Sequence, residues 1–385
     1  MVVRAELRDR KNGRSGTVAE AILLVGGKGT RLRPLTVYTP KPMLEVAGVP
    51  FLSHQIARAK AAGVDRIVFA TAYRPEVFEE YFGDGSRFGL HLEYVTETVA
   101  LGTGGAIRNV ADRLVSGPDE PVFVFNGDIL SGVDLSALLA AHRDRDADVT
   151  LHLTRVPRER LSAFGQVPTD AEGWVTEFRE KPQRPEEFDI TDQINAGCYV
   201  FRRSVIDTIP AGHPVSVERE TFPGLVAAGA KVLGVVDQCY WRDLGTPEAF
   251  VQGSADLVLG AIDSTAIPAT SHPALPDALV LDGARIAADA KVGGGCTIGA
   301  GAAVASGATV HGSVVGASAV VGENSVVRNS IIGRGARIGA DTLLDGVVVG
   351  DGATVGAGNE LKAGVRVWCD STLADGSIRF SSDES

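Results

Sequence analysis

The sequence is poor in cysteine, in long apolar runs and in basic residues. Its 385 residues include four cysteines, which lie far apart and form no C-x-x-C pair. Dispersed thiols of this kind are typical of a reducing compartment, so we expect a cytoplasmic protein. No run reaches the roughly 18 apolar residues of a membrane-spanning helix, so no membrane span is predicted. The polar start lacks the apolar core of a signal peptide, and we expect residues 1–18 to form a mobile tail.

Basic residues are outnumbered by acidic ones. Lysine and arginine number 37, aspartate and glutamate 48, and the net charge is −11. A general nucleic-acid binder would show a basic surface, so that class is excluded. A small anionic ligand is compatible with this charge, because a local basic loop can lie on an acidic protein. The length is too great for one ordinary core and predicts at least two domains.

Residues 19–260 alternate between short apolar runs and helical patterns. Three runs rich in aliphatic residues are Ala21–Val25, Arg66–Thr71 and Val122–Asn126. Such runs fit strands that are covered on both faces. Residues 51–63 and 135–142 carry apolar side chains at helical spacing, and Gly63 offers a helix stop. The alternation predicts an α/β domain with a mostly parallel sheet.

Residues 261–276 are rich in proline and small polar residues and predict a linker. From 277 to 375, aliphatic residues recur every six positions, often followed by glycine. Three sets, separated by two shifts of phase, are Ile286, Val292, Ile298, Val304 and Val310; Val320, Val326, Ile332, Ile338 and Leu344; and Val349, Val355, Leu361 and Val367. This period predicts a left-handed parallel β-helix of hexapeptide repeats, with the phase shifts accommodating short loops. Residues 376–385 are then a C-terminal tail.

The repeat domain offers an alternative function, because hexapeptide-repeat acyltransferases use this fold with a histidine near a coil junction. From residue 277 onward the sequence has a single histidine, His311. A lone histidine at a coil corner is more often a solvated turn residue. We therefore expect an assembly or regulatory role for this domain.

The stretch LLVGGKGTRLRPLT, residues 23–36, places glycines and cations directly after an apolar strand. Gly26, Gly27 and Gly29 expose backbone N–H groups that a polyphosphate can approach closely, with a tight turn as the alternative. The spacing matches neither G-x-x-x-x-G-K-[ST] nor G-x-G-x-x-G. Arg31 supplies a cation within the loop, whereas Lys28 and Arg33 receive no catalytic role.

Three further residues point to phosphate chemistry. Lys41 lies between two prolines in TPKPM, which restrict the backbone and give its ammonium group a defined direction. Asp128 follows a predicted strand at its carboxyl end, where open α/β sheets bind ligands, although a turn-forming role is the alternative. Asp243, in WRDLGT, offers a second carboxylate. Mg²⁺ binds through one or two carboxylates together with substrate phosphates.

The motif GGKGTRLRPLT…TPKPM resembles the opening motif of the sugar-1-phosphate nucleotidyltransferases. Further matches follow in order: LGTGGA at 101–106, NGDIL at 126–130, FGQV at 164–167, EKP at 180–182, NAGCYVF at 195–201 and YWRDLGTPEAF at 240–250. The hexapeptide repeats also suit this family, so the resemblance covers nearly the whole chain beyond the tail. It implies a Rossmann-like nucleotidyltransferase domain that joins a nucleoside triphosphate to a sugar 1-phosphate and releases pyrophosphate.

The resemblance also implies roles for matching residues. The catalytic residues would be Arg31, Lys41, Asp128 and Asp243, with both aspartates binding Mg²⁺. The nucleotide site would comprise Leu24, Gly26, Gly27, Gly29, Thr30, Arg31, Glu97, Gly102 and Thr103. The sugar phosphate would contact Gly165, Glu180, Lys181 and Asn195. The nucleophile is a phosphate monoester with a second pKa near 6, already largely ionised at neutral pH, so no Ser-His-Asp arrangement is needed.

Glu97 lies, by the same resemblance, where thymidylyl- and uridylyltransferases commonly carry glutamine. A carboxylate only accepts hydrogen bonds, and guanine offers two adjacent donors, whereas uracil and thymine offer one between two carbonyls. We therefore expect GTP, with an exposed loop glutamate as the alternative interpretation of Glu97.

We expect mannose 1-phosphate as the acceptor. Glucose 1-phosphate, a cyclitol phosphate such as valienol 1-phosphate, or another nucleoside triphosphate are alternatives within the same reaction. A non-catalytic regulatory paralogue is an alternative of another class. We expect a homo-oligomer with no nucleic-acid or membrane partner.

Overall fold

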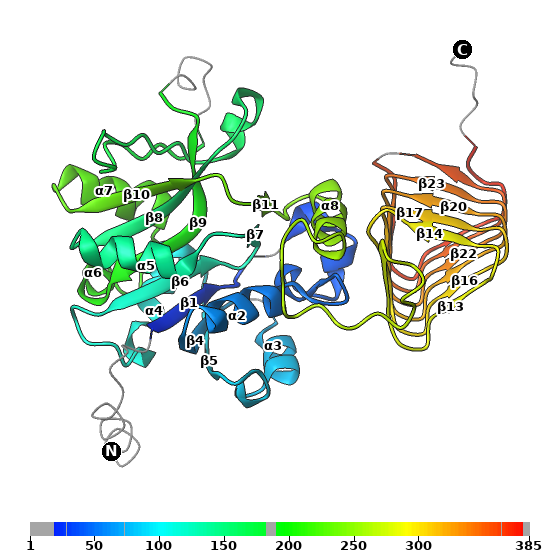
Figure 1. Ribbon diagram of the computed structural model, residues 1–385, viewed down its shortest axis with the longest axis horizontal. Helices are drawn as coiled ribbons and strands as arrows, with labels where there is room; N and C mark the ends of the chain where they lie inside the picture. Colours follow the sequence, from blue (N-terminus) through cyan, green and yellow to red (C-terminus); the bar gives the residue numbers. More distant parts are fainter. Residues whose placement is uncertain (1–18, 28, 73, 182–189, 363, 380–385) are drawn as a thin grey trace.

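The computed structural model describes residues 19–27, 29–72, 74–181, 190–362 and 364–379. The tail predicted for residues 1–18 lies outside the described residues, as does the end of the predicted C-terminal tail. The chain forms an α/β domain with a β-helix packed at its side (Figure 1). Within the described ranges, no helix is long and apolar enough to cross a membrane.

The α/β domain is built on a seven-stranded sheet of order β10-β8-β9-β6-β1-β4-β5. Its strands are β1 (Ala19–Leu24), β4 (Val64–Thr71), β5 (His91–Thr96), β6 (Pro121–Asn126), β8 (Val149–Arg155), β9 (Gln193–Arg202) and β10 (Val232–Asp237). β9 runs antiparallel to β6 and β8. The other neighbours pair in parallel. The predicted mostly parallel α/β sheet is thus confirmed, and the three predicted runs form β1, β4 and β6.

Helices connect the strands and cover the sheet. They are α2 (Phe51–Ala61), α3 (Pro75–Phe82), α4 (Gly102–Asn109), α5 (Leu135–Asp144), α6 (Arg203–Thr208), α7 (Phe222–Ala227) and α8 (Pro247–Val258). α2 ends just before Gly63, whose φ of +86° is easily adopted by glycine, as the sequence predicts. α5 is capped by Asp134, whose carboxylate accepts hydrogen bonds from the backbone N–H of Ser136 and Ala137.

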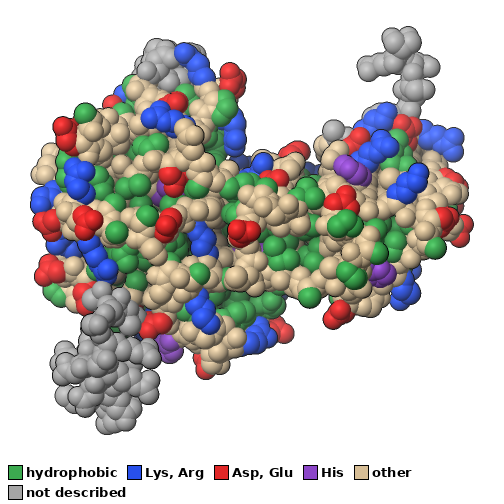
Figure 2. Space-filling view, in the orientation of Figure 1, with side chains coloured by type: hydrophobic (Ala, Val, Ile, Leu, Met, Phe, Trp, Pro, Cys, Tyr) green, Lys and Arg blue, Asp and Glu red, His purple; other side chains and the backbone are tan. Residues whose placement is uncertain are grey.

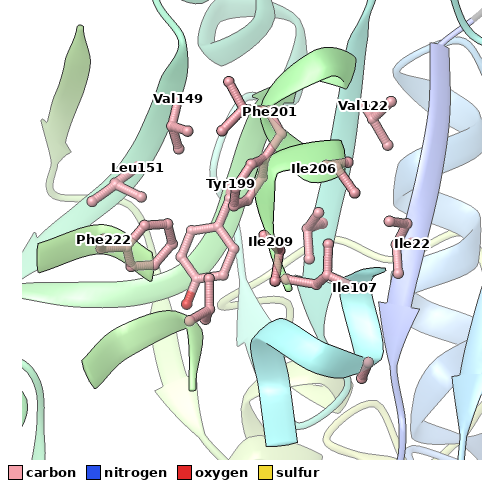
Figure 3. Close-up of a cluster of buried hydrophobic side chains, with 14 of the residues drawn as sticks. Ile22, Ile107, Val122, Val149, Leu151, Tyr199, Phe201, Ile206, Ile209 and Phe222 are labelled. Carbon is pink, nitrogen blue, oxygen red and sulfur yellow. The ribbon is translucent and has the colours of Figure 1, made fainter. Parts of the chain in front are cut away.

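Each face of the sheet has its own apolar core. One core surrounds Tyr199, Phe201 and Phe222, and Figure 3 shows these rings beside aliphatic side chains from several strands and helices. The Tyr199 and Phe222 ring centroids lie 5.0 Å apart in an edge-to-face contact. The other core contains Phe69 and Phe78. Burial on both faces explains why the strands read as continuous apolar runs.

The C-terminal domain consists of three parallel sheets. The first is β12 (Ala278–Val280), β15 (Cys296–Ile298), β18 (Val314–Val315), β21 (Ile331–Ile332), β24 (Val348–Val349) and β27 (Arg366–Val367). The second is β13 (Arg285–Ile286), β16 (Ala303–Val304), β19 (Val320–Val321), β22 (Arg337–Ile338), β25 (Thr354–Val355) and β28 (Thr372–Leu373). The third is β14 (Lys291–Gly293), β17 (Thr309–His311), β20 (Val326–Arg328), β23 (Leu343–Asp345) and β26 (Glu360–Leu361). The predicted β-helix is confirmed, and its left-handed sense stays a prediction.

The phase shifts in the repeat have a different cause from the one predicted. Val321 and Val327 are fully buried in the β-helix core, whereas the predicted Val320 and Val326 are half-buried. Partners on neighbouring coils lie 17 residues apart at positions such as Val314 and Ile331. The repeat is therefore one residue short of three hexapeptides in such a coil, so the phase shift comes from a shortened coil and not from the short loops that were predicted.

One column of side chains on the first β-helix sheet faces the α/β domain. Each member pairs with the next one coil further on: Leu279, Thr297, Val314, Ile331, Val348 and Arg366. The four aliphatic members pack in one cluster with Leu44, Val46 and Phe51 of the α/β domain. We call these six residues the interface column.

The two polar members of the interface column form hydrogen bonds across the boundary. The Thr297 hydroxyl lies 3.2 Å from the Ser254 hydroxyl on α8, which also accepts a hydrogen bond from the Ala47 N–H. Arg366 Nη1 donates to the Arg33 carbonyl at 2.7 Å. The β-helix therefore contacts the glycine-containing loop of residues 23–36 directly.

Candidate active site

The glycine loop follows β1 and continues into the short helix η2 (Thr30–Leu32). Gly29 has a φ of +58°, and a Cβ there would lie 2.8 Å from Lys41 Cβ and 3.0 Å from Thr36 Cγ2. The Thr36 hydroxyl donates to the Gly29 carbonyl at 2.9 Å. Packing therefore requires glycine at position 29. A Cβ at Gly27 would meet no atom within 4 Å, so packing does not require glycine at position 27.

The base of the loop is fixed by the neighbouring strand end. Leu24, the last residue of β1, accepts a hydrogen bond at its carbonyl from the Gly127 N–H at 2.9 Å. A Cβ at Gly127 would lie 2.6 Å from that carbonyl, so the ends of β1 and β6 approach closely because residue 127 is glycine. Gly26 lies against Ala72, where a Cβ would come within 3.1 Å of the alanine methyl group. Thr30 begins η2 and is exposed.

Lys41, Asp128 and Asp243 lie together at the carboxyl ends of the strands. Lys41 Nζ donates to Asp128 Oδ2 at 2.7 Å and lies 3.6 Å from Asp243 Oδ1. The lysine side chain is only 11% exposed, so its charge is directed at the two carboxylates. The structure thus brings together three residues that are far apart in the sequence.

A small two-stranded sheet sets the spacing of the two aspartates. Asp128 directly precedes β7 (Ile129–Ser131), and Asp243 is the last residue of β11 (Trp241–Asp243). β7 and β11 pair antiparallel with Asp243 opposite Ile129. The Leu244 N–H also donates to the Asp128 carbonyl at 3.1 Å. Backbone pairing therefore holds both carboxylates beside one another.

The charges of this group favour a cation. Burial raises the pKa of Asp243, and the nearby charge of Asp128 raises it further, while Lys41 and Arg31 oppose the shift. Asp243 Oδ1 is buried and accepts no hydrogen bond from the described residues. Two adjacent carboxylates, one with an oxygen that accepts no hydrogen bond from the described part of the chain and has only the Lys41 ammonium at 3.6 Å, supply the hard oxygen ligands that Mg²⁺ prefers. These residues therefore fit a divalent cation.

Arg31 extends toward the same group from η2. Its side chain is 66% exposed, and Nη2 lies 4.0 Å from Asp243 Oδ2. A Cβ at Gly245 would lie 2.5 Å from that nitrogen, so the glycine leaves room for the guanidinium group. Arg33 presents its backbone to the β-helix, and Lys28 lies outside the described residues.

The loop from Glu97 to Leu101, which carries the carboxylate expected to contact the base, is anchored at both ends. The Glu97 N–H donates to the Thr71 carbonyl at 2.8 Å, and Glu97 Oε2 accepts from the Leu101 N–H at 3.0 Å. Burial raises the pKa of Glu97, and the hydrogen bond from Leu101 opposes the increase. The carboxylate is therefore held in a defined loop conformation.

Gly102 and Thr103 begin α4, and both contact a distant segment. Gly102 has a φ of +68°, and a Cβ there would lie 2.6 Å from the Val215 carbonyl oxygen. The Thr103 hydroxyl donates to Glu218 Oε2 at 2.6 Å and accepts from the Val217 N–H at 2.9 Å. The hydroxyl is thus used within the protein and ties α4 to the π-helical turn η9 (Val217–Thr221).

The predicted sugar-phosphate residues gather around the largely buried carboxylate of Glu180, whose side chain is 12% exposed. A Cβ at Gly165 would lie 2.6 Å from Glu180 Oε2, so glycine leaves the space that this carboxylate occupies. Burial raises the pKa of Glu180, opposed by Lys181, whose Nζ lies 3.2 Å from Oε1. Lys181 is half-exposed, with a φ of +45°.

Asn195 supports the same region from β9. Its Nδ2 donates to the Tyr199 hydroxyl at 2.8 Å, and its Oδ1 accepts from the Gly197 N–H at 3.1 Å. Its backbone N–H donates to the Gly165 carbonyl at 2.8 Å. The amide side chain is therefore engaged within the protein and positions Gly165.

Four residues that the sequence reasoning assigned no role belong to this region. Gly127 and Gly245 permit close approaches, and both lie within motifs already recognised, so the motifs could have identified them. Glu218 bonds to Thr103, and Gln55 on α2 donates to the backbone on both sides of Asp128. No local pattern identifies these two, since each acts on a residue far away in the sequence.

The space-filling view shows a hollow between the α/β domain and the β-helix (Figure 2). In the same orientation, β11 and α8 lie beneath this hollow (Figure 1).

Comparison with known proteins matches both domains. A family model described as nucleotidyl transferase matches residues 20–258, and one described as GMPPB C-terminal domain matches residues 274–375. A mannose-1-phosphate guanylyltransferase of Mycobacterium tuberculosis is 54% identical over 365 residues, covering 94% of this chain and 98% of that protein. A probable mannose-1-phosphate guanylyltransferase 3 of Oryza sativa subsp. japonica is 38% identical over 61% of this chain and 63% of its own length.

A solved structure resembles the first domain. HddC from Yersinia pseudotuberculosis matches with a TM-score of 0.53 at 24% identity, over 62% of this chain and 98% of its own. At this identity the match supports the fold of the domain alone.

Proposed function

The chain belongs to the nucleotidyl transferase family, and on this premise we propose that it transfers GMP from GTP to mannose 1-phosphate, giving GDP-mannose and pyrophosphate. The observation that carries the proposal is the 54% identity to a mannose-1-phosphate guanylyltransferase over nearly the full length of both chains. The cluster of Lys41, Asp128 and Asp243 supports it, because a reaction between two anions requires positive charge, and two carboxylates that can hold a divalent cation lie beside an ammonium group.

The side chains divide this task between binding and charge neutralisation. Gly26, Gly27 and Gly29 offer backbone N–H groups to the triphosphate, and Arg31 adds an exposed cation beside them. Lys41, buried and fixed, stabilises charge on the reacting phosphoryl group. The sugar phosphate is the nucleophile and needs no protein base.

Asp128 and Asp243 hold Mg²⁺ in this proposal. When bound, the ion neutralises phosphate oxygens and the departing pyrophosphate. The unsatisfied Oδ1 of Asp243 and the proximity of Asp128 support a cation at this place.

Glu97 reads the base in this proposal. Its carboxylate accepts from guanine N1–H and from the 2-amino group, and the bond from Leu101 keeps the acceptor in place. Thr103 contributes by holding α4 against η9. Glu180 and Lys181 recognise the sugar hydroxyls and phosphate, while Gly165 and Asn195 shape their surroundings.

We also propose a homo-oligomer. β27 and β28 stand last in their sheets among the described residues, and unpaired strand edges favour association. Light scattering of the purified chain should give a mass above that of one copy, and a monomer would contradict this part of the proposal.

A substrate panel tests the reaction. GTP, ATP, UTP and dTTP are each incubated with mannose 1-phosphate or glucose 1-phosphate and Mg²⁺, pyrophosphate release is followed, and the products are identified by mass. We expect GDP-mannose from the GTP and mannose 1-phosphate pair at the highest kcat/KM. Turnover with UTP or dTTP but not with GTP would contradict the assignment of guanine.

A further inference from the structure

Gln55 lies on α2 and clamps the turn that carries Asp128. Its Nε2 donates one hydrogen bond to the Asn126 carbonyl at 2.8 Å and another to the Ile129 carbonyl at 2.9 Å. These carbonyls lie on either side of Asp128 in the chain. Both amide hydrogens are therefore used to fix the backbone around one carboxylate.

The same turn is held from two other directions. The Gly127 N–H donates to the Leu24 carbonyl of β1, and the Asp128 carbonyl accepts from the Leu244 N–H next to β11. Those two contacts are made by backbone groups, whereas the two hydrogen bonds from Gln55 are made by a side chain. Removal of the Gln55 amide would therefore leave the turn free to shift toward α2.

A second residue of α2 extends the clamp along β7. Arg58, one helical turn beyond Gln55, donates through Nη1 to the Ser131 carbonyl and through Nη2 to the Val133 carbonyl at 2.8 Å. α2 thus fixes the backbone from residue 126 to residue 133.

α2 is itself rigidly placed beside the lysine segment. The Phe51 N–H donates to the Leu44 carbonyl, and Met43 packs in the same apolar core as Leu52 and Ile56. Because Lys41 lies on η4 (Lys41–Met43), α2 connects the segment of the lysine to the turn of the aspartate. The side chains of Lys41 and Asp128, which lie 2.7 Å apart, are thus carried by two segments that both contact α2.

The chemistry of Gln55 favours a role in positioning. Its Oε1 is buried and has no hydrogen-bond partner among the described residues. An apolar side chain would fill the position without leaving such an oxygen. What the amide adds is a pair of donors for two carbonyls, and both donors act on the Asp128 turn.

We propose that Gln55 is a positioning residue that holds Asp128 in the geometry required to bind the metal. This inference rests on the proposed role of Asp128 as a metal ligand. Residues that orient metal ligands typically change metal affinity or activity by about 10- to 100-fold when they are replaced. We expect effects in this range.

The test measures how much Mg²⁺ tightens GTP binding, without turnover. Calorimetry gives the Kd of GTP in EDTA and in excess Mg²⁺, and the ratio of the two is the metal factor. The full-length variants are Gln55→Leu, which removes both donors, and Gln55→Glu, which keeps the size but replaces the donors with acceptors. Asp128→Asn tests the underlying metal site.

Gln252→Leu is the matched control. Gln252 is an exposed amide on α8 whose Nε2 donates to Asp256 Oδ1. The variant therefore loses one hydrogen bond on the helix surface, and the Asp128 turn is unaffected. Its metal factor should equal that of the wild type. The Mg²⁺ concentration at half-maximal rate is measured for every variant as a second readout.

We expect both Gln55 variants to lower the metal factor by about 10-fold or more, as Asp128→Asn does, with an unchanged Kd in EDTA. If Asp128→Asn lowers the factor but the Gln55 variants do not, the positioning role is wrong and the metal site stands. If the Gln55 variants weaken binding equally with and without Mg²⁺, Gln55 is merely structural and the inference fails. If Asp128→Asn leaves the factor unchanged, the proposed metal ligand is wrong, and the inference falls with it.

Discussion

The substitution Gly29→Ala should lower the free energy of unfolding by an amount that can be calculated from the structure. The left-handed backbone at φ +58° costs a residue with a side chain about 1–2 kcal/mol. The new methyl group would lie 2.8 Å from Lys41 Cβ and 3.0 Å from Thr36 Cγ2. Neither atom lies at the far end of a long, flexible side chain, so neither can move away easily. Overpacking of this kind costs about 1–3 kcal/mol. The expected loss of stability is therefore about 2–5 kcal/mol, the sum of these two costs.

Differential scanning calorimetry should detect this loss. For a domain of this size, 1 kcal/mol lowers Tm by roughly 2–4 °C, so Gly29→Ala should melt at least about 4 °C below the wild type. The same clash displaces Lys41, so kcat should fall as well. A melting temperature equal to that of the wild type would refute the packing argument.

Gly27→Ala is the control within the same loop. A Cβ there meets no atom within 4 Å, so its melting temperature should match that of the wild type. If Gly27 cradles the triphosphate, the methyl group should nevertheless raise the KM for GTP. An unchanged KM would remove Gly27 from the nucleotide site and leave the argument on Gly29 intact.

Three further predictions concern single side chains. Asp243→Asn should lower Mg²⁺-dependent kcat by about 100-fold or more without lowering Tm, because a bound metal supplies several kcal/mol of charge stabilisation; a near-normal rate would remove Asp243 from the site. Glu97→Gln loses charge-assisted hydrogen bonds of about 1.5–3 kcal/mol, so kcat/KM for GTP should fall about 10- to 150-fold relative to that for UTP, and an unchanged ranking of nucleotides would contradict base reading. Burial lowers the pKa of His142 to about 4, so unfolding takes up a proton between that value and the free imidazole value of about 6.5. Stability from this source is complete above pH 6.5 and is lost as the pH falls toward 4; His142→Gln should flatten the pH dependence of the unfolding free energy in this window, and unchanged steepness in urea titrations would contradict it.

Much of the fold follows from periodicity. Strands such as β1 and β6 read as continuous apolar runs because both faces of the sheet are covered, and the six-residue repeat reflects the flat faces of the β-helix. The fully buried Val321 and Val327 were missed by one position. A 17-residue coil is one residue shorter than three hexapeptides, and the sequence does not show where the residue is missing. Adjacent valines, such as Val320 and Val321, allow either position to face the core.

The site was predictable only where a motif carries the chemistry. Lys41, Asp128 and Asp243 were identified from local sequence, and their meeting depends on the pairing of β7 with β11. Three-residue strands have no pattern from which this pairing can be read. The hydroxyl of Thr103 and the amide of Asn195 turned out to bond within the protein. Side-chain direction depends on tertiary contacts that a motif does not record.

The contacts of the interface column with the α/β domain depend on the number of coils in the β-helix. The first sheet has six strands, and neighbouring strands lie about 4.7–4.9 Å apart. Removing one internal coil would shift Arg366 by about that distance along the domain boundary, beyond hydrogen-bond reach of the Arg33 carbonyl. The number of coils in the β-helix therefore sets where Arg366 meets the α/β domain. We expect the chain to tolerate changes of sequence within the coils more readily than a change in the number of coils.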